Sequence, residues 1–208
     1  MRILRQVESS AGNGLYVRRD IADSKRFLRP LARRLARREA AALAAADGIT
    51  GVPHLIAFDG RAVLRRYIEG RPMYAAKPTS PDYFKDALKL LSALHRRGIA
   101  HNDLAKEANW LCTPDGRAAI VDFQIATISR RRGALFRALA REDLRHLLKH
   151  KRTYVPDRLT TRQRALLDRP GPLSRAWARI VKPPYGFVTR RLLGWPERTG
   201  PEERGAPL

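Results

Sequence analysis

Three polar side chains in the middle of the chain are of the types that hold a divalent cation with its phosphates. Asp103 and Asn109 lie in one short segment, and Asp122 ends an apolar run further along. Residues 113–116 (Thr-Pro-Asp-Gly) predict a tight turn, so the apolar runs beside them form a hairpin whose open end brings Asn109 and Asp122 together. Mg²⁺ prefers such oxygens, and one carboxylate is left to accept a proton from a hydroxyl. Taken singly, each residue could instead satisfy backbone groups in a loop or end a strand.

A strongly marked helix comes before this segment. Ser80 is a suitable N-cap, Pro81 fits the first helical position, and apolar residues follow at helical spacing. The basic run 95–97 suits the negative end of the helix, and Gly98 suits a left-handed stop. Residues 99–107 then lead into the hairpin, so this helix and the hairpin must position the three polar side chains.

The first part of the chain predicts a small sheet and one helix. Leu15-Tyr16-Val17 has strong strand preference, and the runs 54–58 and 62–64 flank Asp59-Gly60, which favours a hairpin turn. A helix is expected from Pro30 to Asp47-Gly48. Leu31, Leu35 and Leu43 mark its predicted inner side, and arginines crowd the rest.

Helices dominate the second part. Residues 134–150 and 161–168 have helical patterns, and Thr160 with Gln163 forms a capping box before the second of them. Strands first and helices last indicate an α+β fold.

Composition limits the classes of partner and compartment. Lys and Arg number 42 against 20 Asp and Glu, a net charge of +22, which favours an acidic partner. Cys112 is the single cysteine, so an intramolecular disulfide is excluded and a reducing compartment is favoured. No run is apolar enough for a membrane span, and the start does not resemble a signal peptide. We therefore expect a cytoplasmic protein that could lie on the inner membrane.

The segment His101-Asn102-Asp103-Leu104 to Asn109, followed by the hairpin and Asp122-Phe123-Gln124, resembles a known pair of motifs. These are the H-R-D-L-x-x-x-N catalytic loop and D-F-G segment of the protein-kinase-like superfamily. Within that superfamily, the chain resembles the small bacterial members, which are similar to the RIO kinases and the lipopolysaccharide core-sugar (Kdo/heptose) kinases. The resemblance extends over residues 12–150 and is specific over 94–124.

The resemblance implies a role for each matching residue. Asp103 is the expected catalytic base, and Lys106 is expected to steady the transferred phosphoryl group. Asn109 and Asp122 are the expected ligands of Mg²⁺.

Three upstream residues complete the implied nucleotide site. Arg18 falls where the phosphate-contacting strand lysine belongs, Glu39 where its helix partner belongs, and Glu69 in the hinge that borders adenine. Taken alone, Glu39 could instead be a solvated charge beside neighbouring arginines.

The chain departs from the family pattern in four respects. Gly12-Asn13-Gly14 is too short for the family's full glycine-rich loop over the phosphates, and the whole front lobe is reduced. Asn109 follows Asp103 by one residue more than in the pattern, so Leu104 or Ala105 must bulge. Gln124 replaces the glycine of D-F-G, and Arg18 replaces lysine. His101 is expected to be structural, since Asp103 already supplies the proton acceptor.

The resemblance implies a reduced bilobal architecture and an ATP- and Mg²⁺-dependent activity. A reduced N-lobe is expected over residues 1–70, a helical C-lobe over 71–195, and a disordered tail over 196–208. The implied enzyme is a serine/threonine protein-kinase-like phosphotransferase with a hydroxyl acceptor. Two alternatives are a kinase of a lipopolysaccharide core sugar at the inner membrane and a pseudokinase binding module without transfer.

The basic surface leaves the further partners open. Residues 180–195 interleave cations with aromatic and aliphatic side chains, a composition that suits an anionic membrane. The same segment could pack on the core instead. Nucleic acid is the less favoured partner, because no known binding motif accompanies the cations.

Overall fold

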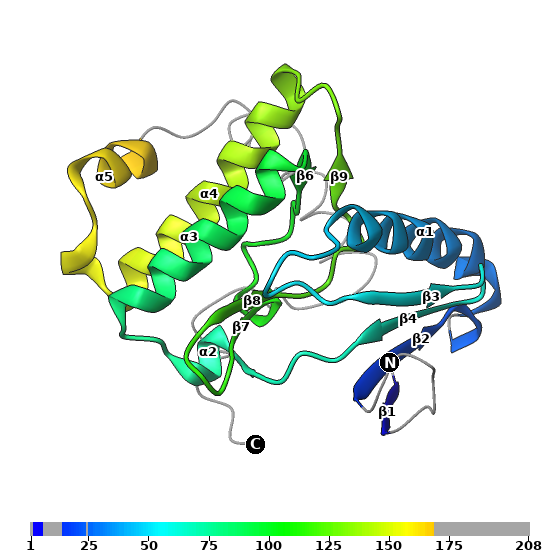
Figure 1. Cartoon of the computed structure of the whole chain (residues 1–208). Coiled ribbons are helices and arrows are strands. Elements are labelled where there is room, and N and C mark those ends of the chain that lie inside the picture. The colour runs from blue at the N-terminus through cyan, green and yellow to red at the C-terminus, as the bar shows by residue number, and fades with distance from the viewer. Residues whose placement is uncertain (1, 6–13, 24, 169–208) are drawn as a thin grey trace, which may run out of the picture. The chain divides into compact units, whose positions relative to one another are not determined.

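The fold is α+β, as the sequence predicts. A computed structural model describes residues 2–5, 14–23 and 25–168 (Figure 1). The chain divides into two compact units, Met1–Leu159 and Thr160–Leu208, the second described over residues 160–168. The basic segment 180–195 and the tail 196–208 lie outside the described residues, and the boundary at residue 70 stays a prediction.

The first part of unit 1 is an antiparallel four-stranded sheet with one covering helix (Figure 1). The strand order is β1-β2-β4-β3, with β1 at Arg2–Arg5, β2 at Leu15–Asp20, β3 at Leu55–Phe58 and β4 at Ala62–Arg66. The predicted hairpin is confirmed: Gly60 has a φ of 80°, and Asp59 Oδ1 accepts hydrogen bonds from the next backbone amides. Two 3-10 helices, η1 (Ile21–Asp23) and η2 (Arg26–Leu28), lead into α1 (Arg29–Ala45).

Helix α1 is confirmed, but one residue of its predicted inner side is wrong. Its buried side consists of Ala36, Glu39, Ala40, Ala42 and Leu43. Leu31 is exposed, because this buried side packs on the sheet only from the middle of the helix onward. The first turn of α1 therefore leaves apolar surface uncovered.

The rest of unit 1 is mainly helical. Its elements are β5 (Arg71–Pro72), α2 (Met73–Ala76), α3 (Pro81–Arg96), β6 (Ile99–Ala100), η3 (Glu107–Asn109), β7 (Trp110–Cys112), β8 (Ala118–Ile120), β9 (Thr127–Ile128), α4 (Ala134–Tyr154) and η4 (Pro156–Arg158). Helices α3 and α4 lie side by side (Figure 1). Two small sheets, β5-β7-β8 and β6-β9, connect them to the rest.

The predicted ends of α3 are confirmed. Ser80 Oγ accepts a hydrogen bond from the Asp82 amide at 3.2 Å. Gly98 has a φ of 74°, and a Cβ there would collide with the Ser129 carbonyl, so both conformation and space require glycine. Helix α4 runs to Tyr154 rather than ending at His150, because its last turn still packs on the core.

The main hydrophobic core joins the end of α1 to α3, α4 and the β7-β8 hairpin. A smaller cluster of Ile21, Ala36 and Val63 lies between α1 and the sheet. In the part of the chain that the structure describes, no helix combines the length and apolar character needed to cross a membrane.

Unit 2 is described through α5 (Thr161–Asp168). The predicted capping box is confirmed: the Gln163 amide donates to Thr160 Oγ1, and the Thr160 amide donates to Gln163 Oε1, both at 3.2 Å.

Candidate functional site

The loop between β6 and β7 brings together three predicted site residues, two of which contact the carboxylate of the third. Lys106 Nζ lies 2.7 Å from Asp103 Oδ2. Asn109 Nδ2 donates to the same oxygen at 3.0 Å and to the Asp103 carbonyl at 2.9 Å. The short 3-10 turn η3 folds the chain back and produces this closeness. Both Asn109 bonds use the amide nitrogen, which leaves its Oδ1 available for a cation.

Of the two residues expected to form the bulge, Leu104 is buried and Ala105 is exposed. The Leu104 carbonyl accepts hydrogen bonds from His150 Nε2 at 2.9 Å and Trp110 Nε1 at 3.3 Å. These hydrogen bonds hold the backbone at Leu104, the residue next to Asp103.

Asp122 lies just beyond β8, beside Asn109. The Val121 amide donates to the Asn109 carbonyl at 3.0 Å. The backbone that leads into Asp122 therefore runs beside that of Asn109. Asp122 adopts a left-handed φ of 69°, which is uncommon for a residue other than glycine. Its Oδ1 is buried without a hydrogen-bond partner. A buried, unpartnered carboxylate oxygen fits a hard cation such as Mg²⁺.

His101 links the Asp103 loop to the segment that carries Asp122. Its Nε2 donates to the Val121 carbonyl at 3.0 Å, its Nδ1 accepts from the Asp103 amide at 3.3 Å, and its ring meets Phe123 edge-on at 4.7 Å. One ring nitrogen donates and the other accepts, so the neutral imidazole satisfies both bonds. Burial lowers the pKa of His101, which favours the same neutral form. These contacts agree with the structural role expected for His101.

Asp143 of α4 is a site residue that the sequence reasoning missed. It is fully buried, and its Oδ2 accepts from the His101 amide at 2.7 Å while its Oδ1 accepts from the Asn102 amide at 2.9 Å. Asn102 also has a left-handed φ, of 68°. One carboxylate thus holds the two peptide groups that precede Asp103. A sequence signal was present, because Asp143 occupies the apolar stripe of α4, four residues before Leu147.

The second side of the loop is also held by α4. The Tyr154 hydroxyl donates to Glu107 Oε2 at 2.6 Å, and His150 Nδ1 lies 3.8 Å from Glu107 Oε1. Burial lowers the pKa of His150. Helix α4 therefore fixes the loop on both sides of Asp103.

Glu39 is buried, and its cationic partners differ from the one the resemblance suggests. It forms ion pairs with Arg19 of β2 and, at 3.4 Å, with Arg65 of β4. Burial raises the pKa of Glu39, and the two guanidinium groups oppose that shift. The alternative of a solvated helix charge is therefore wrong for Glu39.

Arg18 does not pair with Glu39. Its guanidinium lies 2.8 Å from Asp20 and is 43% exposed, because neighbouring residues of a strand point to opposite faces. Arg19 takes the place at Glu39 that the resemblance suggested for Arg18. Arg65 was not singled out from the sequence, although it follows the apolar run 62–64 within strand β4 and is buried.

The charged group around Glu39 also reaches Asp122. The charge of Asp122 raises the pKa of both Glu39 and Arg65, which places the carboxylates and the guanidinium within electrostatic range of one another. The dominant effect on Arg65 is burial, which lowers the pKa of its guanidinium. The charge of Asp122 is therefore near enough to the Glu39 group to contribute to both pKa values.

Glu69 lies apart from this group. It is exposed, in the connection between β4 and β5, and forms no hydrogen bond or ion pair within the described part of the chain. Its predicted role beside adenine stays a prediction.

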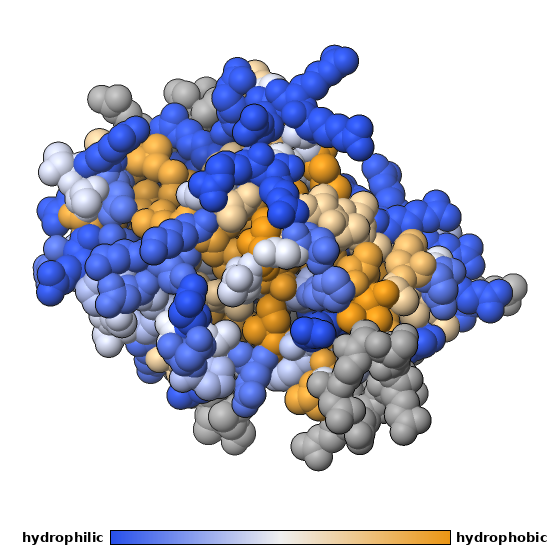
Figure 2. Space-filling view, in the orientation of Figure 1, coloured by the Kyte–Doolittle hydropathy of each residue, from blue (hydrophilic) through white to orange (hydrophobic). Residues whose placement is uncertain are grey.

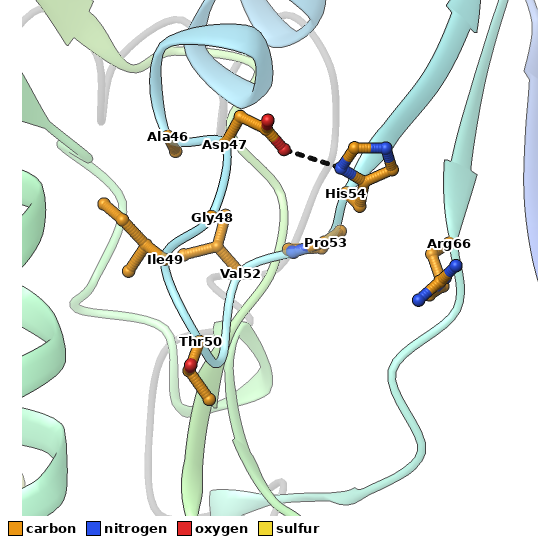
Figure 3. Close-up of a pocket in the computed structure, with 9 residues that line it drawn as sticks. All are labelled: Ala46, Asp47, Gly48, Ile49, Thr50, Val52, Pro53, His54 and Arg66. Carbon is orange, nitrogen blue, oxygen red and sulfur yellow. Dashed lines mark hydrogen bonds and ion pairs between the residues drawn. The ribbon is translucent and has the colours of Figure 1, made fainter.

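A pocket of 360 Å³ lies at the connection that follows the C-terminal end of α1, and not at the Asp103–Asp122 region (Figure 3). It is lined by residues 46–50 and 52–54 with Arg66, and a hydrogen bond of 2.6 Å joins His54 Nδ1 to Asp47 Oδ1 at its edge. None of the predicted site residues lines this pocket. The chemistry proposed for the chain therefore rests on the Asp103–Asp122 region and not on this pocket.

A search of protein-family models found none that matches this chain.

Proposed function

We propose that the chain is an ATP-dependent phosphotransferase of the protein-kinase-like superfamily, which passes the γ-phosphoryl group to a hydroxyl acceptor. The observation that carries the proposal is the grouping around Asp103. Lys106 and Asn109 both contact its Oδ2, and Asp122 follows the residue bonded to the Asn109 backbone. A proton acceptor, a cation and two metal-type oxygens in one place are the parts that phosphoryl transfer needs.

Each residue has a distinct task in this proposal. Asp103 orients the acceptor hydroxyl and takes its proton as the new oxygen–phosphorus bond forms and the bond to the departing ADP breaks. Lys106 balances the negative charge of the transferred group. Asn109 Oδ1 and Asp122 Oδ1 would hold Mg²⁺, which when bound neutralises phosphate charge.

The sheet contributes the cations that face the nucleotide. Arg19 and Arg65 are proposed to meet phosphate oxygens, with Glu39 holding both guanidinium groups in place. A guanidinium fork suits phosphate, as the strand lysine does in the resembled family, although its reach differs. This assignment transfers to Arg19 the role first expected of Arg18.

The acceptor is proposed to be either a serine or threonine of a protein or a sugar hydroxyl of a lipid-linked glycan, since both need the same machinery. Because ATP is the donor, the proposed location is the cytoplasm. A binding module without transfer is the competing function, and the experiment below separates it.

The test combines transfer and binding on matched variants. The full chain is incubated with labelled ATP, Mg²⁺ and separate protein and envelope-lipid fractions. Asp103→Asn is expected to lower transfer about 10²- to 10⁴-fold while MgATP still raises the melting temperature. Asp122→Asn is expected to weaken the Mg²⁺-dependent part of that thermal shift. Asp157→Asn, at an exposed residue of η4, is the control and keeps full transfer.

Two results would count against the proposal. Full transfer by both site variants would show that the site is wrongly assigned. No transfer and no MgATP-dependent thermal shift in the natural chain would favour a binding module of another kind.

A further inference from the structure

The start of α1 exposes three large apolar side chains. Phe27 is 75% exposed, Leu28 is 42% exposed and Leu31 is 54% exposed. They lie on η2 and the first turn of α1, and Leu31 is separated from the other two by three and four residues. Helical residues at that spacing are neighbours on the surface. We call this surface, with the cations around it, the α1 tip.

Cations surround the apolar residues of the α1 tip. Those exposed to solvent are Lys25, Arg29, Arg33, Arg34 and Arg37. No ion pair joins any of the five to a carboxylate whose side chain the structure describes, a set that does not include Asp23. The first turn of α1 also contains no acidic residue. Positive side chains at the positive end of a helix are unfavourable for the helix itself. A negatively charged partner would therefore stabilise the α1 tip.

The space-filling view agrees with this mixed chemistry. Hydrophilic and apolar side chains lie next to one another in the region of α1 (Figure 2). A surface that only kept the protein in solution would not need exposed phenylalanine and leucine among its arginines.

We propose that the α1 tip docks on an anionic lipid bilayer. Phe27, Leu28 and Leu31 would enter the boundary between headgroups and acyl chains, and the five cations would meet lipid phosphates. RNA would satisfy the cations and leave the apolar side chains in water, whereas an apolar protein groove would leave the cations without partners. The bilayer surface is the partner that uses both. This inference does not depend on phosphotransfer.

The test measures sedimentation of the full chain with phosphatidylcholine vesicles, with and without phosphatidylglycerol. Binding is expected with the anionic vesicles and should fall as salt is raised. The double variant Phe27→Ser/Leu31→Ser is expected to lower partitioning at least about tenfold, because it removes the inserted apolar surface. Arg33→Glu/Arg34→Glu is expected to lower it at least about 25-fold, at about fivefold for each cation lost.

Matched controls keep the test specific. Leu135→Ser removes another exposed apolar side chain, at the start of α4. Arg152→Glu/Arg158→Glu changes the net charge by the same amount at exposed residues of α4 and η4. Both controls should bind anionic vesicles within about twofold of the natural chain, since neither alters the tip.

Several outcomes would overturn the proposal. If the Phe27→Ser/Leu31→Ser variant binds vesicles as the natural chain does, another segment makes the contact. If the natural chain binds an RNA oligomer but not anionic vesicles, the cations serve nucleic acid. If the chain is a dimer that the same variant dissociates, and vesicles are not bound, a second copy covers the tip.

Discussion

Two buried carboxylates, Glu39 in α1 and Asp143 in α4, flank the candidate site, and they work in different ways. Glu39 is paired with the side chains of Arg19 and Arg65. Asp143 accepts hydrogen bonds from the backbone amides of His101 and Asn102, and the His95 ring of α3 lies 3.3 Å from one of its oxygens. Side-chain cations can exchange one anion for another, but backbone amides are fixed by the fold. On the sheet side, a bound anion could therefore compete with Glu39 for the two guanidinium groups. On the helical side, a ligand would leave the hydrogen bonds of Asp143 to the backbone unchanged.

The largest expected loss of stability comes from removing the Asp143 carboxylate on the helical side. Asp143→Ala leaves one buried and one part-buried amide without their acceptor and should lower the free energy of unfolding by about 4 kcal/mol, measured by urea denaturation. Asp143→Asn keeps one acceptor oxygen and should recover about half of that loss. An effect of Asp143→Ala no larger than that of the exposed Asp157→Ala would show that the amides are satisfied without it.

A smaller loss is expected on the sheet side. Glu39→Gln removes the charge shared by two guanidinium groups, but burial raises the pKa of Glu39 and so already disfavours that charge, and the free energy of unfolding should fall by no more than about 1 kcal/mol. The loss is smaller because the Arg19 side chain is 23% exposed and can turn toward water. Glu69→Gln, at an exposed position, is the control for this urea measurement. Added inorganic phosphate should restore part of the stability of Glu39→Gln and none of that of Asp143→Ala.

Lowering the pH should change the stability of the helical side and of the sheet side in opposite directions, by smaller amounts than the substitution at Asp143. Burial lowers the pKa of His146 in α4 to about 4, so between this value and its ordinary pKa of 6.5 the unfolded chain binds the proton and the folded chain does not. The resulting stability is present above pH 6.5 and is lost as the pH falls, by about 2 kcal/mol between pH 7 and pH 5. Glu39 has a raised pKa, so its contribution is present at low pH and is lost as the pH rises.

Urea unfolding at the two pH values checks this expectation. The variant His146→Gln should lose less stability on acidification than the natural chain, and Glu39→Gln should lose slightly more. An identical pH dependence in His146→Gln and the natural chain would contradict the assignment of the acid sensitivity to α4.

Local patterns predicted much of the framework around the site. The Ser80 cap, the Asp59-Gly60 turn and the Thr160–Gln163 capping box all occur as expected. The closeness of Asp103, Lys106 and Asn109 also followed from their spacing, since one short loop carries all three. Such features depend on hydrogen bonds between residues a few positions apart, and those are visible in a single window of sequence.

The neighbours of Glu39 and the anchoring of the loop by Asp143 were decided only by tertiary structure. Adjacent residues of a strand face opposite ways, so one residue of register determined that Arg19 rather than Arg18 meets Glu39. The exposure of Leu31 likewise depended on how far α1 extends past the sheet. Sequence by itself determined which side chains could do chemistry and which turns bring them near. The packing of distant elements determined which partners they meet, because burial and long-range contacts depend on the whole fold.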